Sequence, residues 1–174
     1  MHKIHYDSLL SEFKNKAELL QKALSSTKED NATAMQYFHQ FERFSNLSAQ
    51  EILQQFKPKS KDILELLAFE LHHSSFNDLK KTIKDPFFSL QKDSFHHLWF
   101  DKYSEALCYL NQRGGFLLPH NKRYFLCQKD YIHAIGLSEK DNAWQKIKYN
   151  WVYPVDSKAH FKLFCQLLQA QHPQ

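Results

Sequence analysis

Glycine and proline are scarce in this chain of 174 residues, which contains three glycines and five prolines. The two residue types together make up about 12% of an average protein and concentrate in turns and loops. We therefore expect short loops and a mostly helical chain. With 43% hydrophobic and 24% charged residues, the chain can bury an ordinary core, so folding needs neither a disulfide nor a structural metal.

The few glycines also limit the chemistry that the protein can perform. They lie at Gly114, Gly115 and Gly136. A phosphate-binding loop or a dinucleotide fingerprint needs several glycines in one turn, so the common nucleotide-dependent enzymes are excluded. The sequence has no Gly-x-Ser-x-Gly motif of the kind that serine hydrolases use. We expect no cofactor.

Disulfides and membrane spans are not expected either. Cys108, Cys127 and Cys165 are odd in number and lie far apart beside apolar neighbours, which favours reduced thiols in the core. The first residues lack the apolar stretch of a secretory signal, and no run approaches the roughly 18 apolar residues of a membrane span. These absences predict a cytoplasmic protein without a membrane partner.

The positive charge is unevenly distributed. The net charge is +4, and residues 1–85 contain 12 basic and 12 acidic residues, whereas residues 86–174 contain 11 and 7. The whole excess therefore lies in the second half. A basic bias of this size is compatible with a nucleic-acid or acidic protein partner, and also with neither.

The first half of the sequence has helical periodicity. Apolar residues recur every three or four positions over residues 9–24, 35–44 and 63–71, which predicts helices with a buried face. Ser48 and Ser75 each stand at the start of a capping-box spacing, so we expect a helix to begin after each serine.

The second half mixes helices with one hairpin. We predict a long helix over residues 95–113, then two strands over 116–119 and 124–127 that flank the turn 120–123. Pro119 indicates an edge strand. A short helix over 130–135, a helix carrying Trp144, Ile147 and Trp151, and a final helix capped by Asp156 or Ser157 complete the prediction.

The predicted fold class is mainly α with one β-hairpin (α+β), in a compact multi-helix domain. Asp85-Pro86 is the best candidate boundary. It divides the chain into a helical unit, 1–85, and a unit of helices plus the hairpin, 86–174. One continuous domain is the alternative.

Residues 62–81 carry the pattern Glu-Leu-Leu-Ala, an apolar turn and Ser-Phe-Asn-x-Leu-Lys. This pattern resembles the small helical module of bacterial glyoxalase-related proteins. Where a glycine-containing turn is expected, this chain has His72 and His73. The resemblance does not extend to glyoxalase activity, because the sequence contains a single hairpin and none of the metal-binding βαβββ units.

Residues 116–154 are similar to the C-terminal part of uncharacterised proteins of bacterial plasmids and mobile elements. The segments that carry this likeness are 118–120, 131–137 and 151–154. The resemblance implies a bacterial protein carried on a mobile element, and it implies no activity.

Three histidines follow an acid by three positions, and the pairs are Glu70…His73, Asp93…His96 and Asp130…His133. This spacing places both groups on one face of a helix, and paired helices of this kind build di-iron sites. Chance predicts about one such pair here, so we expect no metal site, and a metal-dependent enzyme is the alternative. Cys127 with His133 is a further candidate nucleophile and base, although the cysteine lies in an apolar strand pattern.

The candidate binding surface is basic and lies in the second half, interleaved with Tyr124, Tyr149 and Trp151. Its cations can neutralise phosphates, and exposed aromatic rings can stack on bases. Trp144, Ile147 and Trp151 share one helical face and are expected in the core instead. The cationic residues are Arg113, Lys122, Arg123, Lys129, Lys140, Lys146 and Lys148.

These observations predict a non-enzymatic bacterial accessory protein that binds nucleic acid or a protein partner through its basic C-terminal half. Arg113, Lys122, Arg123, Lys129, Lys146 and Lys148 are its predicted binding residues. A protein-only adaptor or homodimer is an alternative. A DNA-reading helix that carries Lys80, Lys81 and Lys84 is another.

Overall fold

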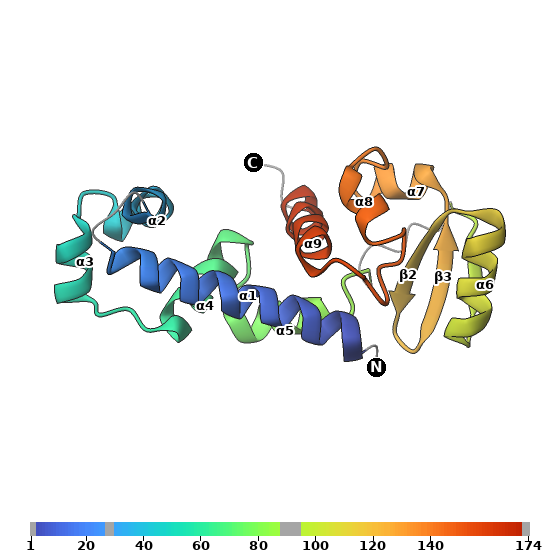
Figure 1. Ribbon diagram of the computed structural model, residues 1–174, viewed down its shortest axis with the longest axis horizontal. Coiled ribbons are helices and arrows are strands. Elements are labelled where there is room, and N and C mark those ends of the chain that lie inside the picture. The colour runs from blue at the N-terminus through green and yellow to red at the C-terminus, as the bar shows by residue number, and fades with distance from the viewer. Residues whose placement is uncertain (1–2, 27–29, 88–94, 172–174) are drawn as a thin grey trace.

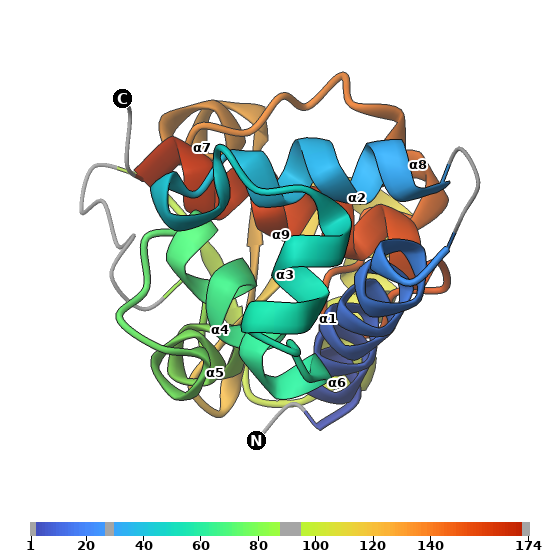
Figure 2. The same ribbon diagram turned by 90° about the vertical axis from the view of Figure 1, so that its left-hand side faces the viewer.

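The computed structural model describes residues 3–26, 30–87 and 95–171, and it confirms a mainly α-helical α+β fold. Helices α2 and α3 form one end of an elongated molecule, and a three-stranded antiparallel sheet forms the other (Figure 1). Figure 2 looks along the long axis, with α2 and α3 in front. The described helices are α1 (Lys3–Leu24), α2 (Asp30–His39), α3 (Ala49–Gln55), α4 (Ser60–Glu70), α5 (Phe76–Lys84), α6 (Tyr103–Arg113), α7 (Lys129–Ala134), α8 (Asn142–Lys146) and α9 (Ser157–Gln171), with a 3₁₀ turn η1 (Glu42–Phe44). None of them has both the length and the apolar character of a membrane span.

Both predicted serine caps are present. The Ser48 side chain accepts a hydrogen bond from the Glu51 amide, and the Glu51 carboxylate accepts one from the Ser48 amide at 2.7 Å, which completes a capping box before α3. Ser75 accepts from the Asp78 amide at 3.1 Å and begins α5. The sequence located these helix starts because a cap depends on residues within one turn of each other.

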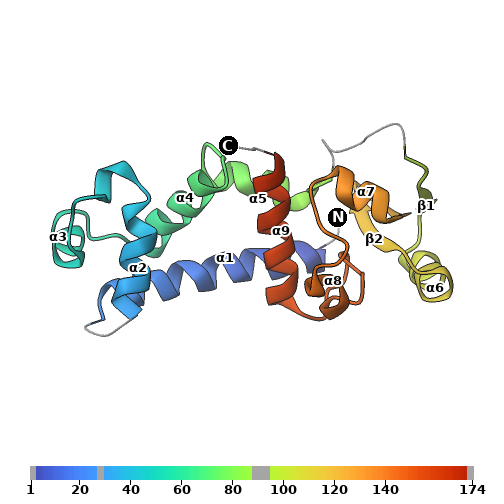
Figure 3. The same cartoon turned by 90° about the horizontal axis from the view of Figure 1, so that it is seen from above.

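The last helix joins the two halves of the chain. Asp156 caps α9 by accepting from the Ala159 amide at 2.9 Å, as predicted. Helix α9 crosses α1 between the helical end and the sheet (Figure 3). The Phe13 ring of α1 lies 4.8 Å from the Phe161 ring, and Ser157 donates to Glu12 at 2.6 Å. One hydrophobic core therefore runs from α1 through α9 to the sheet.

The predicted hairpin is present as β2 (Phe116–His120) and β3 (Arg123–Cys127). With β1 (Leu98–Phe100), the sheet order is β1-β3-β2. Strand β2 with Pro119 is an edge strand, as predicted. Its outer side is hydrogen-bonded at one residue, because the Leu117 amide donates to the Tyr149 carbonyl at 2.9 Å and the Trp151 amide donates to the Leu117 carbonyl at 3.0 Å.

The prediction of one helix over 95–113 is wrong in its first part. Leu98–Phe100 form strand β1, which pairs with β3, and α6 begins only at Tyr103. Phe100 contacts Tyr109 of α6, whereas Trp99 packs against Phe125 on the opposite face of the sheet. A run of three apolar residues is too short to show a periodicity that distinguishes a strand from a helix.

The cysteine prediction is correct in part. No disulfide joins the three cysteines, and Cys127 is buried, but Cys108 is exposed on α6. The Cys127 thiol donates to the Phe116 carbonyl, and burial raises its pKa well above the ordinary value. A buried thiol of raised pKa is a poor nucleophile, so the candidate pair with His133 has no support in this environment.

Gly136 follows α7 and packs closely against α9. Its φ is +83°, and it donates to His133 while Leu137 donates to Ile132, the two hydrogen bonds of a Schellman cap. A Cβ atom at position 136 would lie 2.3 Å from the Cβ of Ala170 in α9. Only glycine satisfies both the left-handed backbone and this contact.

We predict that Gly136→Ala lowers the free energy of unfolding by about 2–4 kcal/mol. This value is the sum of the cost of a left-handed backbone at an alanine and the cost of steric overlap with Ala170. Urea denaturation followed by circular dichroism measures the change. The Gly136→Ala, Ala170→Gly double variant should recover the steric part, so the two changes will not be additive. Unchanged stability of Gly136→Ala would contradict this close packing.

Candidate nucleic-acid interface

The structure divides the predicted binding residues between the two ends of the hairpin. Lys122 and Arg123 lie at its turn, whereas Lys129 and Lys148 line a pocket at its open end. Arg113 directly precedes Gly114 of this pocket. The five-residue strands separate the two ends by about 16 Å at 3.3 Å per residue. Lys146 ends α8 and does not line the pocket.

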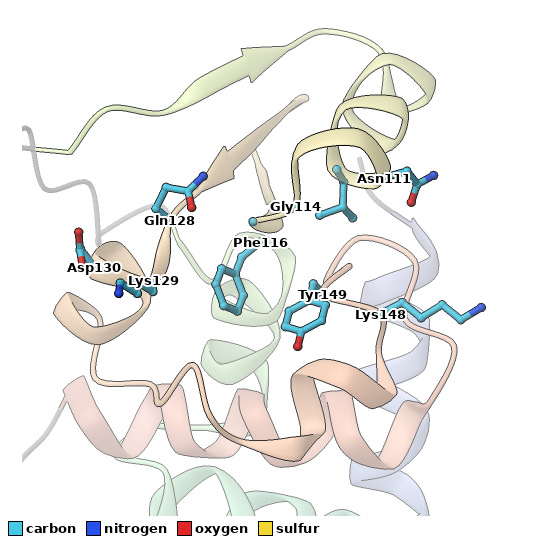
Figure 4. A pocket seen from close by; sticks show the side chains of 10 residues that line it. Asn111, Gly114, Phe116, Gln128, Lys129, Asp130, Lys148 and Tyr149 are labelled. Atoms are coloured by element: carbon cyan, nitrogen blue, oxygen red, sulfur yellow. The ribbon is translucent and has the colours of Figure 1, made fainter.

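The open-end pocket, formed where the end of α6, the start of β2, the start of α7 and the turn after α8 meet, has a volume of about 650 Å³. The rings of Phe116 and Tyr149 lie together at its centre, 5.4 Å apart at an angle of 77° (Figure 4). Phe116 is buried, and Tyr149 is half-buried. Polar side chains surround the rings, with Gln128, Lys129 and Asp130 on one side and Asn111 and Lys148 on the other.

Two glycines connect α6 to β2 along this pocket. Gly114 has φ +72° and ψ −163°, and Gly115 has φ +103°. These backbone angles are essentially restricted to glycine. A Cβ atom at position 115 would also lie 3.0 Å from the Cys127 carbonyl. The glycines are therefore required for the chain reversal that forms the pocket wall, although they form no glycine-rich phosphate loop.

The opposite wall is a left-handed turn made without glycine. Lys148 has φ +53° and Tyr149 has φ +55°. The Lys148 amide donates to Gln145 at 2.9 Å and the Tyr149 amide to Trp144 at 2.8 Å, so the pair forms a Schellman cap on α8. Glycine normally occupies the first of these positions, and a residue with a side chain is strained there.

This turn corrects the predicted position of Trp151. The helix ends at Lys146, so Trp151 does not share it with Trp144. Trp151 is nevertheless fully buried, as expected for the core, and its ring lies 5.0 Å from Phe87 and 4.8 Å from His160. Of the three aromatic residues placed among the basic ones, Tyr149 is the one that lines the open-end pocket.

The cations at the open end differ from Arg123 of the candidate surface in their ion pairing. Arg113, Lys129 and Lys148 make no ion pair with any residue that the structure describes. Asp130 is the acidic residue of the pocket lining, and it is exposed. An incoming phosphate therefore does not need to displace a carboxylate from these three cations.

The hairpin turn is electrostatically different. Arg123 donates to Asp101 at 2.7 Å and lies 5.5 Å from the Trp99 ring centroid. His120, expected in the exposed turn, is instead buried at the end of β2 with its Nδ1 3.7 Å from the Asp85 carboxylate. Asp85 also accepts from the Asn121 amide at 2.8 Å, which fixes the turn against the end of α5.

A second hollow of about 580 Å³ lies beside this turn. Lys84 of α5 lines it together with Lys122 and Arg123. The sequence grouped Lys84 with the candidate DNA-reading helix, and only the fold brings it to the hairpin. Because Asp85 also lines the hollow and Asp101 holds Arg123, this site is less favourable for an anion than the open-end pocket.

The two acid–histidine pairs that the structure describes in full do not form a common site. His73 contacts the Leu71 carbonyl and the Thr82 hydroxyl, while the Glu70 carboxylate lies 3.6 Å from the Lys16 ammonium group. Asp93 of the second pair lies outside the described residues.

In the third pair, His133 contacts Glu139 instead of Asp130. The hydrogen bond with His133 lowers the pKa of Glu139. The described residues contain no group of three or more potential metal ligands.

We predict that Lys148→Gly raises the free energy of unfolding by about 1 kcal/mol, because it relieves the left-handed backbone of a residue with a side chain. Lys146→Gly is the matched control, because it removes the same charge from the helical end of α8. It should lower stability by up to about 1 kcal/mol. Thermal denaturation compares the two, and destabilisation by Lys148→Gly would contradict the assigned turn.

Comparison with protein-family models, with curated proteins and with solved structures finds no match for this chain. The resemblances noted in the sequence therefore stay predictions.

Proposed function

We propose that this protein is a non-enzymatic binding module for single-stranded nucleic acid. In this proposal an unpaired base enters the open-end pocket and contacts Phe116 and Tyr149. Lys129, Lys148 and Arg113 contact the phosphates on either side of that base. The observation that carries the proposal is the combination of an aromatic pair in a pocket with three nearby cations that form no ion pair with the described part of the chain.

The shape of the pocket favours a single strand over a duplex. Bases of a duplex are stacked and paired, so they cannot enter a concave site without being flipped out. Single-strand binding proteins combine aromatic side chains that contact bases with a positively charged path for the backbone. The volume of about 650 Å³ is large enough for one base with part of its sugar.

The cellular setting is part of the same proposal. A bacterial accessory role in the cytoplasm is proposed from the resemblance of residues 116–154 that the sequence predicts and from the absence of a predicted signal or membrane span. No catalytic group is assigned, and the binding of a protein partner is the second candidate.

The proposal is tested by fluorescence anisotropy of labelled single-stranded and duplex oligonucleotides at about 50 and 200 mM salt. Three phosphate contacts predict that the logarithm of affinity falls with the logarithm of salt concentration with a slope of about 2. We expect single strands to bind more tightly than duplexes. No binding of single strands at the lower salt concentration would refute the proposed function.

Variants locate the binding site. Lys129→Ala and Lys148→Gly should each lower the salt slope by about 0.7 and weaken binding. Lys148→Gly is informative because its lost affinity cannot come from unfolding if the variant is more stable. Lys146→Gly controls for the removal of a nearby charge and should have a smaller effect.

The turn variant Lys122→Ala, Arg123→Ala tests the other end of the hairpin. It should retain most of the affinity, because Asp101 already holds Arg123. If this variant abolishes binding while Lys148→Gly has no effect, the nucleic acid lies at the turn and the assignment to the open-end pocket is wrong.

A further inference from the structure

The open-end pocket contains a carboxylate, which a site for phosphates alone does not need. Asp130 lines the pocket beside Lys129, is exposed, and forms no ion pair with any residue that the structure describes. It lies on the same side of the aromatic pair as Gln128 (Figure 4). A carboxylate repels the phosphates of a nucleic acid. It therefore favours binding only where the ligand brings hydrogen-bond donors to it.

The other polar side chains of the pocket do not distinguish between bases in the same way. Asn111 and Gln128 are exposed carboxamides, and each has both a donor and an acceptor. A carboxamide can present either group to any base, whereas an ionised carboxylate only accepts. The two lysines of the pocket are assigned to the phosphates. Asp130 is therefore the lining residue whose chemistry selects one base over another.

The bases differ in the donors that their Watson–Crick edges offer to a carboxylate. Guanine presents two adjacent donors, N1–H and the N2 amino group, which match the two oxygens of one carboxylate. Adenine and cytosine present one amino group next to a ring nitrogen that accepts. Thymine and uracil present one N–H group between two carbonyl acceptors. In a single strand these edges are free to be read by a protein, so guanine is the base that Asp130 binds best.

We propose that the open-end pocket selects guanine from a single strand, with the Asp130 carboxylate accepting hydrogen bonds from N1–H and from the N2 amino group. The same base contacts Phe116 and Tyr149, while the neighbouring phosphates contact the cations. This inference rests on the proposed single-strand binding, whose ligand it narrows to a strand that contains guanine. A bidentate contact of this kind distinguishes one base from another by about 5- to 150-fold.

Displacement of a labelled thymine-only strand from the full chain, followed by fluorescence anisotropy, tests the selection. The competitors are thymine strands of one length with a single central guanine, adenine, cytosine or hypoxanthine, so the number of phosphates is constant. The guanine strand should compete at least about fivefold better than the adenine and cytosine strands. The hypoxanthine strand should be intermediate, because it lacks the N2 amino group. Equal competition by all strands, or preference for another base, overturns the selection and leaves single-strand binding intact. If no strand binds, the proposed function and this inference both fail.

The variant Asp130→Asn assigns the preference to this carboxylate. It should reduce the guanine preference to less than about twofold, while affinity for the thymine-only strand is retained or rises because a negative charge is removed. Glu42→Gln is the matched control, since it removes the same charge from the exposed Glu42 of η1, away from the sheet, and it should keep the full guanine preference. Circular dichroism checks that both variants fold. A guanine preference that survives Asp130→Asn, or that Glu42→Gln also abolishes, overturns the assignment.

Discussion

Two hydrogen bonds at Leu117 connect the segment after α8 to the sheet. The Leu117 amide donates to Tyr149 and its carbonyl accepts from Trp151, at 2.9 and 3.0 Å. They satisfy backbone groups of an edge strand that would otherwise stay open. Because they fix residues on both sides of Asn150, they also place the Tyr149 ring beside Phe116 and the Trp151 ring in the core between Phe87 and His160. The pocket and the core therefore depend on the same contact.

The left-handed backbone of Lys148 and Tyr149 costs folding stability, and it also places both side chains at the open-end pocket. A glycine at 148 would relieve backbone strain, yet the residue there is a lysine at the edge of a pocket. Strained residues of this kind concentrate where a side chain must be held in one place for binding. The Schellman cap after α7 has a glycine, Gly136, at the equivalent position and is not strained. The close contact of Gly136 with Ala170 leaves no space for a side chain there.

The sequence predicted the features whose cause is local. The Ser48 and Ser75 caps and the β2–β3 hairpin follow from residues within a few positions of each other. Strand β1 was missed because Leu98–Phe100 are apolar on both faces, and its strand state depends on β3, more than 20 residues away. The turn at Lys148 was missed because its usual signal is glycine.

The candidate site was predicted in composition but not in arrangement. The sequence named Lys122, Arg123, Lys129 and Lys148 as one basic surface, since charge alone carries no information on distance. The hairpin places them at its opposite ends, and Asp101 holds one of them in an ion pair. Phe116 was expected only as a strand residue, and its role in the pocket needs Tyr149 from a different segment.

The central claim is that an unpaired base contacts Phe116 and Tyr149. Photocrosslinking of a bromouracil-substituted single strand, followed by mass spectrometry of the digested protein, tests that contact directly. The account predicts that the crosslinked peptides contain Tyr149 or Phe116. Crosslinks confined to Trp99 or to the hairpin turn, with none at the open-end pocket, would contradict it.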